Sequence, residues 1–236
     1  MYEINIPANM QASLSDGEFK IYARDNGDDA AELFLMEEIG EDMMGDGISA
    51  KDVIDFLSAN KNRKINVRIN SPGGLVYDGL QMFNALSSHN AEVVATVEGL
   101  AFSAATIVAM AADKVRMHEA SDFGIHRAWG VAMGNAKVLD GVREWLAKID
   151  DHLIDIYSAR TGQSRQKIEQ WMDGTDDGTV FSAKEALEAG FADEIIPMAK
   201  KDKKKANLAA NPVFARRVRA EHQAKLAAIR AKYQRK

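Results

Sequence analysis

The sequence predicts an α/β protein whose central sheet is built mainly of parallel strands. Along residues 31–197, short β-branched runs alternate with segments that have the length and apolar pattern of helices. Such alternation is typical of a parallel sheet covered by helices. The chain has 236 residues, enough for one large domain with a substantial core. Its composition, 46% hydrophobic and 28% charged, is that of an ordinary globular protein.

Charge divides the chain near residue 198. Residues 198–236 carry 13 Lys and Arg against 2 Asp and Glu, whereas the remainder carries 17 against 33. An acidic body followed by a basic segment indicates different partners for the two parts. We therefore predict a polar N-terminal segment (1–30), a folded domain (31–197) and a basic tail (198–236). Within the tail, Pro212 is typical of the first residue of a helix.

Composition excludes several classes of site. The chain has no cysteine, so it forms no disulfide, thiolate nucleophile, zinc ribbon or iron–sulfur cluster. Its longest apolar run, residues 100–112, has 13 residues, whereas a transmembrane helix needs about 20. The N-terminus lacks the basic start and apolar stretch of a signal peptide. We therefore expect a soluble cytoplasmic protein that uses no cofactor or metal and contacts no membrane.

In the first half of the chain, strands and helices are predicted in turn. A short strand is expected near residues 19–23, and a second over 32–39. Ser49 begins a pattern that resembles a capping box, which predicts the start of a short helix. The β-branched residues 65–69 predict a strand that ends at a Pro-Gly turn, and a helix follows over 77–88.

The second half continues this alternation and contains one long amphipathic helix, over residues 135–159. Its apolar residues recur at spacings of three and four, which indicates one buried face. These residues are Val138, Val142, Trp145, Ile149, Leu153 and Ile156. The other expected elements are strands 92–98, 114–117, 123–125 and 194–196, a small-residue helix opening around Ser103, and a helix that starts at a full capping box at Ser182 and ends at Gly190.

The first motif with chemical potential is the turn Asn-Ser-Pro-Gly-Gly at residues 70–74. Two glycines let a ligand approach bare backbone amides, and amides at a helix N-terminus form a cradle for an anion or an oxyanion. Taken alone, the motif is more typical of a tight turn. It is not a Walker loop, because no Gly-Lys-Ser/Thr follows.

The second motif is Gly-Leu-Ala-Phe-Ser-Ala-Ala, at residues 99–105. A serine where a strand turns into a helix presents its Oγ at the helix N-terminus, where developing negative charge is favoured. Ala105 excludes the Gly-x-Ser-x-Gly elbow of the α/β-hydrolases. In isolation, Ser103 is more simply an N-cap residue.

The third motif is Gly-Ile-His-Arg at residues 124–127. His126 ends a short predicted strand and has the side chain of a general base near neutral pH. A single histidine is more often structural than catalytic, so this motif alone carries little weight.

Together, these motifs resemble the Clp protease proteolytic subunit. The pattern is Asn-Ser-Pro-Gly-Gly, Gly-x-Ala-x-Ser, Ile-His and Phe-Ser-Ala-x-Glu-Ala-x-x-x-Gly-x-x-Asp, in this order over residues 33–196. Residues 67–70, 76–80 and 109–113 look most like the phage branch of the family, whose members serve as head-maturation (prohead) proteases.

The resemblance implies a ClpP/crotonase-like fold of stacked ββα units and a serine peptidase mechanism. It makes Ser103 the nucleophile and His126 its base, and it assigns the oxyanion hole to the backbone amides of Gly74 and Ala104. It also implies self-assembly into rings that enclose the active sites. These roles agree with what acyl transfer needs, namely an activated hydroxyl, an oriented imidazole and preorganised donors.

The triad acid departs from the family pattern. The pattern places Asp or Glu four residues before the serine of Phe-Ser-Ala, and that position here is Gly178. Asp177 is the expected acid and Asp176 the alternative, because flanking glycines let the loop bring one carboxylate inward. A Ser–His dyad, held by a backbone carbonyl or by Thr179, is the remaining possibility.

The leading functional hypothesis is a phage head-maturation endopeptidase that cleaves capsid or scaffold precursors in the host cytoplasm or the procapsid. A close variant is a host-type Clp peptidase that works with an unfoldase ATPase. Other classes are a crotonase-fold acyl-CoA enzyme, a Ser–Lys protease using Lys114 or Lys137, and a non-catalytic scaffold. For the basic tail, the expected partner is an acidic protein or nucleic acid, and the alternative is a solvated helix or a disordered segment.

Overall fold

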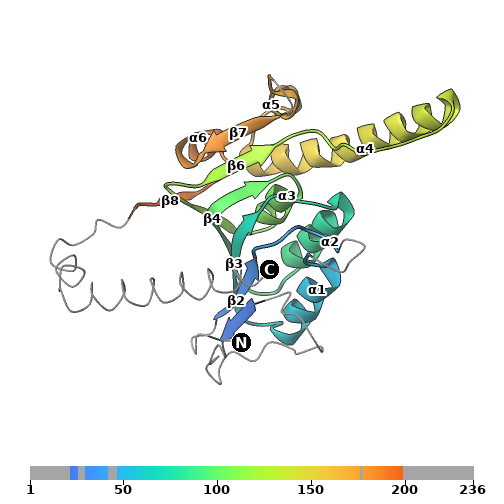
Figure 1. The fold of residues 1–236 in the computed structure, drawn as a ribbon. Helices are drawn as coiled ribbons and strands as arrows, with labels where there is room; N and C mark the ends of the chain where they lie inside the picture. The colour runs from blue at the N-terminus through green and yellow to red at the C-terminus, as the bar shows by residue number, and fades with distance from the viewer. Residues whose placement is uncertain (1–21, 26–29, 42–46, 176–177, 199–236) are drawn as a thin grey trace, which may run out of the picture. The chain divides into compact units, whose positions relative to one another are not determined.

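The structure, a computed structural model, describes residues 22–25, 30–41, 47–175 and 178–198 (Figure 1). Its strands form one eight-stranded sheet, in which β1-β2-β3-β4-β5-β8 is the main path. The strands are β1 (Tyr22–Asp25), β2 (Ala30–Leu35), β3 (Lys64–Ser71), β4 (Val93–Phe102), β5 (Lys114–His118), β6 (Asp122–Ile125), β7 (Thr179–Ser182) and β8 (Glu194–Ile196). The helices are α1 (Ala50–Ala59), α2 (Val76–Ser87), α3 (Ala104–Met110), α4 (Ala136–Thr161), α5 (Arg165–Asp173) and α6 (Ala183–Ala189).

The predicted α/β class is confirmed. Strands β2, β3, β4, β5 and β8 pair in parallel, and only β1 joins this path antiparallel. The buried apolar residues of β3, Ile65, Val67 and Ile69, alternate along the strand and so share one face of the sheet, and α1 and α2 lie along one side of it (Figure 1). Within the described ranges, no helix is long and apolar enough to span a membrane.

Strand β4 belongs to two ladders and thereby positions the candidate site. Its first part, Val94 to Val97, pairs with β5, and its last part, Leu100 to Phe102, pairs with β6. The pairing with β3 is irregular just where β4 changes partner. β7 then adds to β6 in antiparallel orientation. The two strands that end at Ser103 and His126 are therefore hydrogen-bonded neighbours.

The long helix departs from its predicted burial. Helix α4 starts at the Asn135 cap, but its buried side chains lie only from Ile149 onward. Val138 and Trp145 are 48% and 44% exposed. The N-terminal half of α4 extends away from most of the described fold (Figure 1). Its apolar stripe meets that fold at Trp145, whose Nε1 donates to the Tyr77 hydroxyl of α2 at 2.8 Å, and at the partly buried Leu146.

The other differences between the predicted and the observed elements concern short segments. Helix α5 and strand β7 were not predicted, because each buries only one or two apolar residues and shows no clear period. The Ser182 capping box and the Gly190 helix end are confirmed. At α1, Ser49 caps the Asp52 amide, but the Asp52 carboxylate accepts from the Ser49 hydroxyl, so the box is incomplete.

The predicted segment bounds remain predictions. By its contacts the chain divides into Met1–Pro197 and Met198–Lys236. The basic tail beyond Met198, with the predicted helix from Pro212, lies outside the described residues, as does most of the 1–30 segment.

Candidate active site

Ser103 occupies the turn between β4 and α3 in a conformation that L-residues rarely adopt. Its φ is 53° and its ψ is −126°, and no other non-glycine residue in the described ranges has a positive φ. Such a backbone costs on the order of 1–3 kcal/mol and persists only where the surroundings impose it. Although Ser103 holds the N-cap position of α3, its hydroxyl makes no capping hydrogen bond. Capping therefore does not explain this serine.

Hydrogen bonds from three elements hold the turn. The Ser103 N–H donates to the Gly124 carbonyl of β6 at 2.9 Å. The Ser103 carbonyl accepts from Thr106 Oγ1 at 2.6 Å, and Thr106 Oγ1 lies 2.6 Å from the Tyr157 hydroxyl of α4. Because the Thr106 proton is committed to Ser103, Tyr157 donates to Thr106. Burial raises the pKa of Tyr157 far above its usual value, so this hydroxyl keeps its proton.

The glycine-rich turn lies directly against the serine. A Cβ on Gly73 would stand 2.6 Å from Ser103 Cβ and 2.9 Å from the Ala104 nitrogen, so no side chain fits there. Gly73 also has a φ of 97°. At Gly73 the backbone of the glycine turn comes close to the backbone at Ser103 and Ala104. Gly74 is the next residue of that turn. The Ala104 amide opens α3, where the helix itself provides no acceptor. Both predicted oxyanion donors therefore belong to the same small region.

His126 follows β6 at the same end of the sheet. Phe102 pairs with Gly124 in the β4–β6 ladder, so Ser103 and His126 leave neighbouring strands together. No hydrogen bond joins their side chains in the part of the chain described. His126 Nδ1 lies 2.6 Å from the Arg127 carbonyl oxygen. A carbonyl only accepts, so Nδ1 carries a proton, and in this tautomer of the neutral imidazole Nε2 has the lone pair that a general base requires.

The family's acid position lies beside His126 but has no room for a side chain. Thr179 pairs with Ile125, which brings Gly178 against the histidine. A Cβ on Gly178 would stand 2.6 Å from His126 Cβ, and the residue has a φ of 107°. The predicted acid Asp177 and its alternative Asp176 lie outside the described residues. Their assignment therefore remains a prediction.

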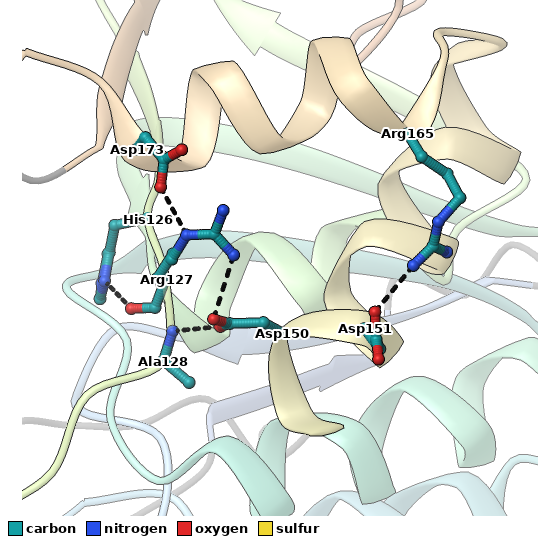
Figure 2. Close-up of polar contacts among 7 residues, drawn as sticks. All are labelled: His126, Arg127, Ala128, Asp150, Asp151, Arg165 and Asp173. Carbon is teal, nitrogen blue, oxygen red and sulfur yellow. Dashed lines mark hydrogen bonds and ion pairs between the residues drawn. The ribbon is translucent and has the colours of Figure 1, made fainter. Parts of the chain in front are cut away.

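A charged cluster next to His126 was missed by the sequence analysis (Figure 2). Arg127 Nε donates to Asp173 Oδ1 at 2.5 Å, and its Nη1 donates to Asp150 Oδ2 at 3.3 Å. Asp150 Oδ1 also accepts from the Ala128 N–H at 2.8 Å. The hydrogen bond from Arg127 holds the pKa of Asp173 below its usual value, and the same contact raises the pKa of Arg127.

The lysines considered for a Ser–Lys mechanism lie elsewhere. Lys114 begins β5 opposite Val94, near the start of β4, whereas Ser103 follows the other end of that strand. Lys114 is also paired with Glu194 at 2.5 Å. Lys137 is exposed in the first turn of α4. Neither lysine has a contact with Ser103 in the described structure.

Comparison with known proteins assigns the family. A family model for Clp protease matches residues 18–199, most of the chain. The chain belongs to the Clp protease family. The ATP-dependent Clp protease proteolytic subunit of Streptococcus salivarius is 30% identical over 191 residues, covering 79% of this chain and 93% of that protein. Its counterpart from Chlorella vulgaris is 28% identical over 166 residues, covering 69% and 80%.

A solved structure confirms the fold of this Clp protease. A ClpP1 point mutant from Listeria monocytogenes superposes with a TM-score of 0.60 at 23% identity, covering 70% of this chain and 91% of that one. Membership of the family makes the chain a serine peptidase. This result separates it from the crotonase-fold acyl-CoA enzymes and the non-catalytic scaffolds considered above. The phage branch is not distinguished by these matches.

The Clp protease also exposes an apolar segment just after its histidine. Trp129, Val131 and Met133 are 74%, 94% and 92% exposed and alternate along the chain. Val138 and Leu139, at the start of α4, continue this surface at 48% and 45% exposure. An apolar surface of this kind, uncovered within the described chain, is typical of an interaction site.

Proposed function

We propose that this Clp serine peptidase is an endopeptidase of the phage head-maturation type that cleaves capsid or scaffold precursors. The strained turn at Ser103 is the observation that carries the peptidase assignment, because its hydroxyl makes no capping hydrogen bond and strained backbone of this kind is typical of catalytic residues. The phage-like residues 67–70, 76–80 and 109–113 and the basic tail support the narrower assignment.

In the proposed mechanism, Ser103 Oγ attacks the scissile carbonyl and His126 Nε2 takes its proton. The same proton passes from His126 to the leaving amine, and water then hydrolyses the acyl-enzyme by the reverse route. The amides of Gly74 and Ala104 hold the oxyanion. The orienting group on His126 is Asp177 in the sequence prediction, with Asp176 as its alternative.

The proposed enzyme works as a ring of copies of this chain, in the host cytoplasm or within a procapsid. The exposed residues Trp129, Val131 and Met133 support self-association, because so much uncovered apolar surface is unusual on a monomer. The second candidate is a peptidase that needs an unfoldase ATPase. The relatives named as ATP-dependent proteolytic subunits favour it.

The test compares the wild type with Ser103→Ala. We expect the wild type to cleave casein or a capsid precursor and to react with a fluorophosphonate probe, and we expect the variant to do neither. The variant should keep the particle mass of the wild type in solution, because Ser103 makes no cap hydrogen bond that its loss could remove. Cleavage at the wild-type rate by Ser103→Ala would show that the nucleophile is another residue.

The same assay separates the two candidates. A head-maturation protease cleaves a folded capsid precursor without added nucleotide or ATPase. A peptidase that depends on an unfoldase degrades only short peptides until the ATPase and ATP are added.

A further inference from the structure

The peptide group between Arg127 and Ala128 is hydrogen-bonded on both sides (Figure 2). Its carbonyl oxygen, that of Arg127, accepts from His126 Nδ1 at 2.6 Å. Its N–H, that of Ala128, donates to Asp150 Oδ1 at 2.8 Å. Because a peptide group is planar and rigid, a carboxylate on α4 and the imidazole of His126 are fixed relative to each other through one unit.

Asp150 is the one buried charged residue in the described ranges, at 8% exposure. A buried carboxylate is costly unless hydrogen bonds and an opposite charge compensate it. Here the compensation comes from the Ala128 amide and from Arg127 Nη1, both next to His126. The next residue, Asp151, is placed as surface carboxylates usually are: its side chain is exposed and forms an ion pair with Arg165 at 2.8 Å.

Arg127 ties the same peptide group to a second helix. Its guanidinium lies between Asp150 of α4 and Asp173, the last residue of α5. The Arg127 side chain is therefore held at two points, which limits rotation of the peptide group that follows it. Rotation of that group would turn its carbonyl oxygen away from Nδ1.

We propose that Asp150 is a positioning residue that orients His126 through the Arg127–Ala128 peptide group. This inference rests on the proposed peptidase function. When Ser103 passes its proton to His126 Nε2, the imidazolium keeps its Nδ1–H on the Arg127 carbonyl. An amide whose N–H is bound by a carboxylate presents a more polarised carbonyl oxygen, because hydrogen bonds in a chain strengthen one another. Asp150 thus supports the charge on His126 without touching it.

Two observations at the histidine favour this route over a direct carboxylate. Gly178 has no space for a side chain against His126. Nδ1 has one proton, and the Arg127 carbonyl already accepts it. A carboxylate from Asp177 would have to displace that carbonyl.

The experiment measures kcat and KM on casein, and the rate of fluorophosphonate labelling, for the full-length protein. We expect Asp150→Ala to lower kcat about 100-fold, the size of effect that a small misplacement of a catalytic group produces. Asp150→Asn keeps an acceptor for the Ala128 amide but loses the charge, so we expect a loss of about tenfold. KM should change little for both variants, because Asp150 acts on the histidine and not on the substrate.

Two controls separate positioning from stability. Asp151→Ala removes the neighbouring exposed carboxylate and should leave kcat and the melting temperature as in the wild type. Leu153→Ala removes buried packing from the same helix and should lower the melting temperature while leaving kcat nearly unchanged. Because Asn matches Asp in size, a loss of kcat in Asp150→Asn is not expected from loss of packing alone.

Three results would overturn the inference: kcat of Asp150→Ala equal to that of Asp151→Ala, an equal loss of kcat in Leu153→Ala, or a large loss in Asp177→Asn with none in Asp150→Ala. In each case the proposed peptidase function stands if Ser103→Ala still abolishes cleavage and labelling. A wild-type protein that neither cleaves nor labels would overturn both.

Discussion

At the scale of the residue, Ser103 shows most clearly that the fold is shaped around a function. The sequence motif allowed an ordinary N-cap serine, but the hydroxyl does not cap α3 and the backbone has a positive φ. Hydrogen bonds to Gly124 and from Thr106 impose this geometry. The strained backbone therefore lowers the stability of the fold, and the Ser103 side chain makes no capping hydrogen bond that would offset this cost.

The strain can be measured by replacing Ser103 with glycine. We expect Ser103→Gly to be more stable than Ser103→Ala by about 1 kcal/mol, because glycine adopts this φ freely and alanine does not. Both variants should be inactive. Urea unfolding of the two proteins gives the difference.

The matched control is Ala105→Gly, two residues further on in the regular part of α3. There glycine should destabilise by about 1 kcal/mol or more, since it adds only backbone freedom and a small cavity. A Ser103→Gly protein that is less stable than Ser103→Ala would show that the turn is not strained.

Residues of the site differed in how far the sequence could reveal them. Ser103, His126 and the Gly73–Gly74 turn stand in short motifs of fixed order, and the structure brings all of them to one end of β4 and β6. Asp150 stands in a run of charged residues on an amphipathic helix, where each carboxylate looks equally solvated. Only the tertiary contact between α4 and the segment after His126 distinguishes it from Asp151.

At the scale of the element, the sequence predicted most of the helices and the strands of the parallel sheet, including the short β6 and β8, and missed two short elements without a clear pattern. The strands of the parallel sheet have β-branched runs, and α6 has a complete capping box. Strand β7 buries only Phe181, and α5 buries only Ile168 and Met172, so neither has a readable period. The apolar stripe of α4 is real, but its N-terminal half stays largely exposed at Val138 and is covered only in part, by the contact of Trp145 with Tyr77.

The edge pairing of β5 with β8 should depend on pH in a defined way. Hydrogen bonds from Arg116 and Lys114 lower the pKa of Glu194 to about 2. The carboxylate has a pKa of about 4.3 in the unfolded chain. Because the folded value is the lower one, the stabilisation is complete above about pH 4.3 and disappears as the pH falls towards 2.

Melting temperatures of the wild type and Glu194→Gln test this expectation. Their difference should be constant from pH 7 to about pH 5 and should shrink steadily below it. A difference that persists unchanged to pH 2 would mean that Glu194 stabilises the sheet by something other than its charge. The pairs are half-exposed, so added salt should also reduce the difference at neutral pH.

At the scale of the whole molecule, the basic tail is expected to be separable from the peptidase domain. All the buried apolar residues of the described structure lie between Ala31 and Ala192. A chain ending at Pro197 loses 13 Lys and Arg and none of this core. We therefore expect the truncated protein to fold, assemble and cleave casein as the full chain does. Circular dichroism, particle mass and the casein assay check these three points.

The truncated chain also tests the partner proposed for the tail. If the tail binds an acidic protein or nucleic acid, the full chain should bind it at low salt, lose affinity as salt rises, and lose it altogether on truncation. Binding that is indifferent to salt would exclude an electrostatic role. A fall in casein cleavage on truncation would place the tail within the peptidase itself.

The glycine beside His126 has a consequence for how this protein can change over generations. At position 178, a mutation to aspartate would need both a side chain within 2.6 Å of the histidine and a backbone that L-residues avoid. A single mutation to aspartate at that position is therefore incompatible with the present path of the loop. While the loop keeps this path, mutations that adjust the histidine can act only through other groups around it. The lineage carrying this loop is expected to diversify at positions 127, 150 and 173 in concert, while position 178 stays glycine.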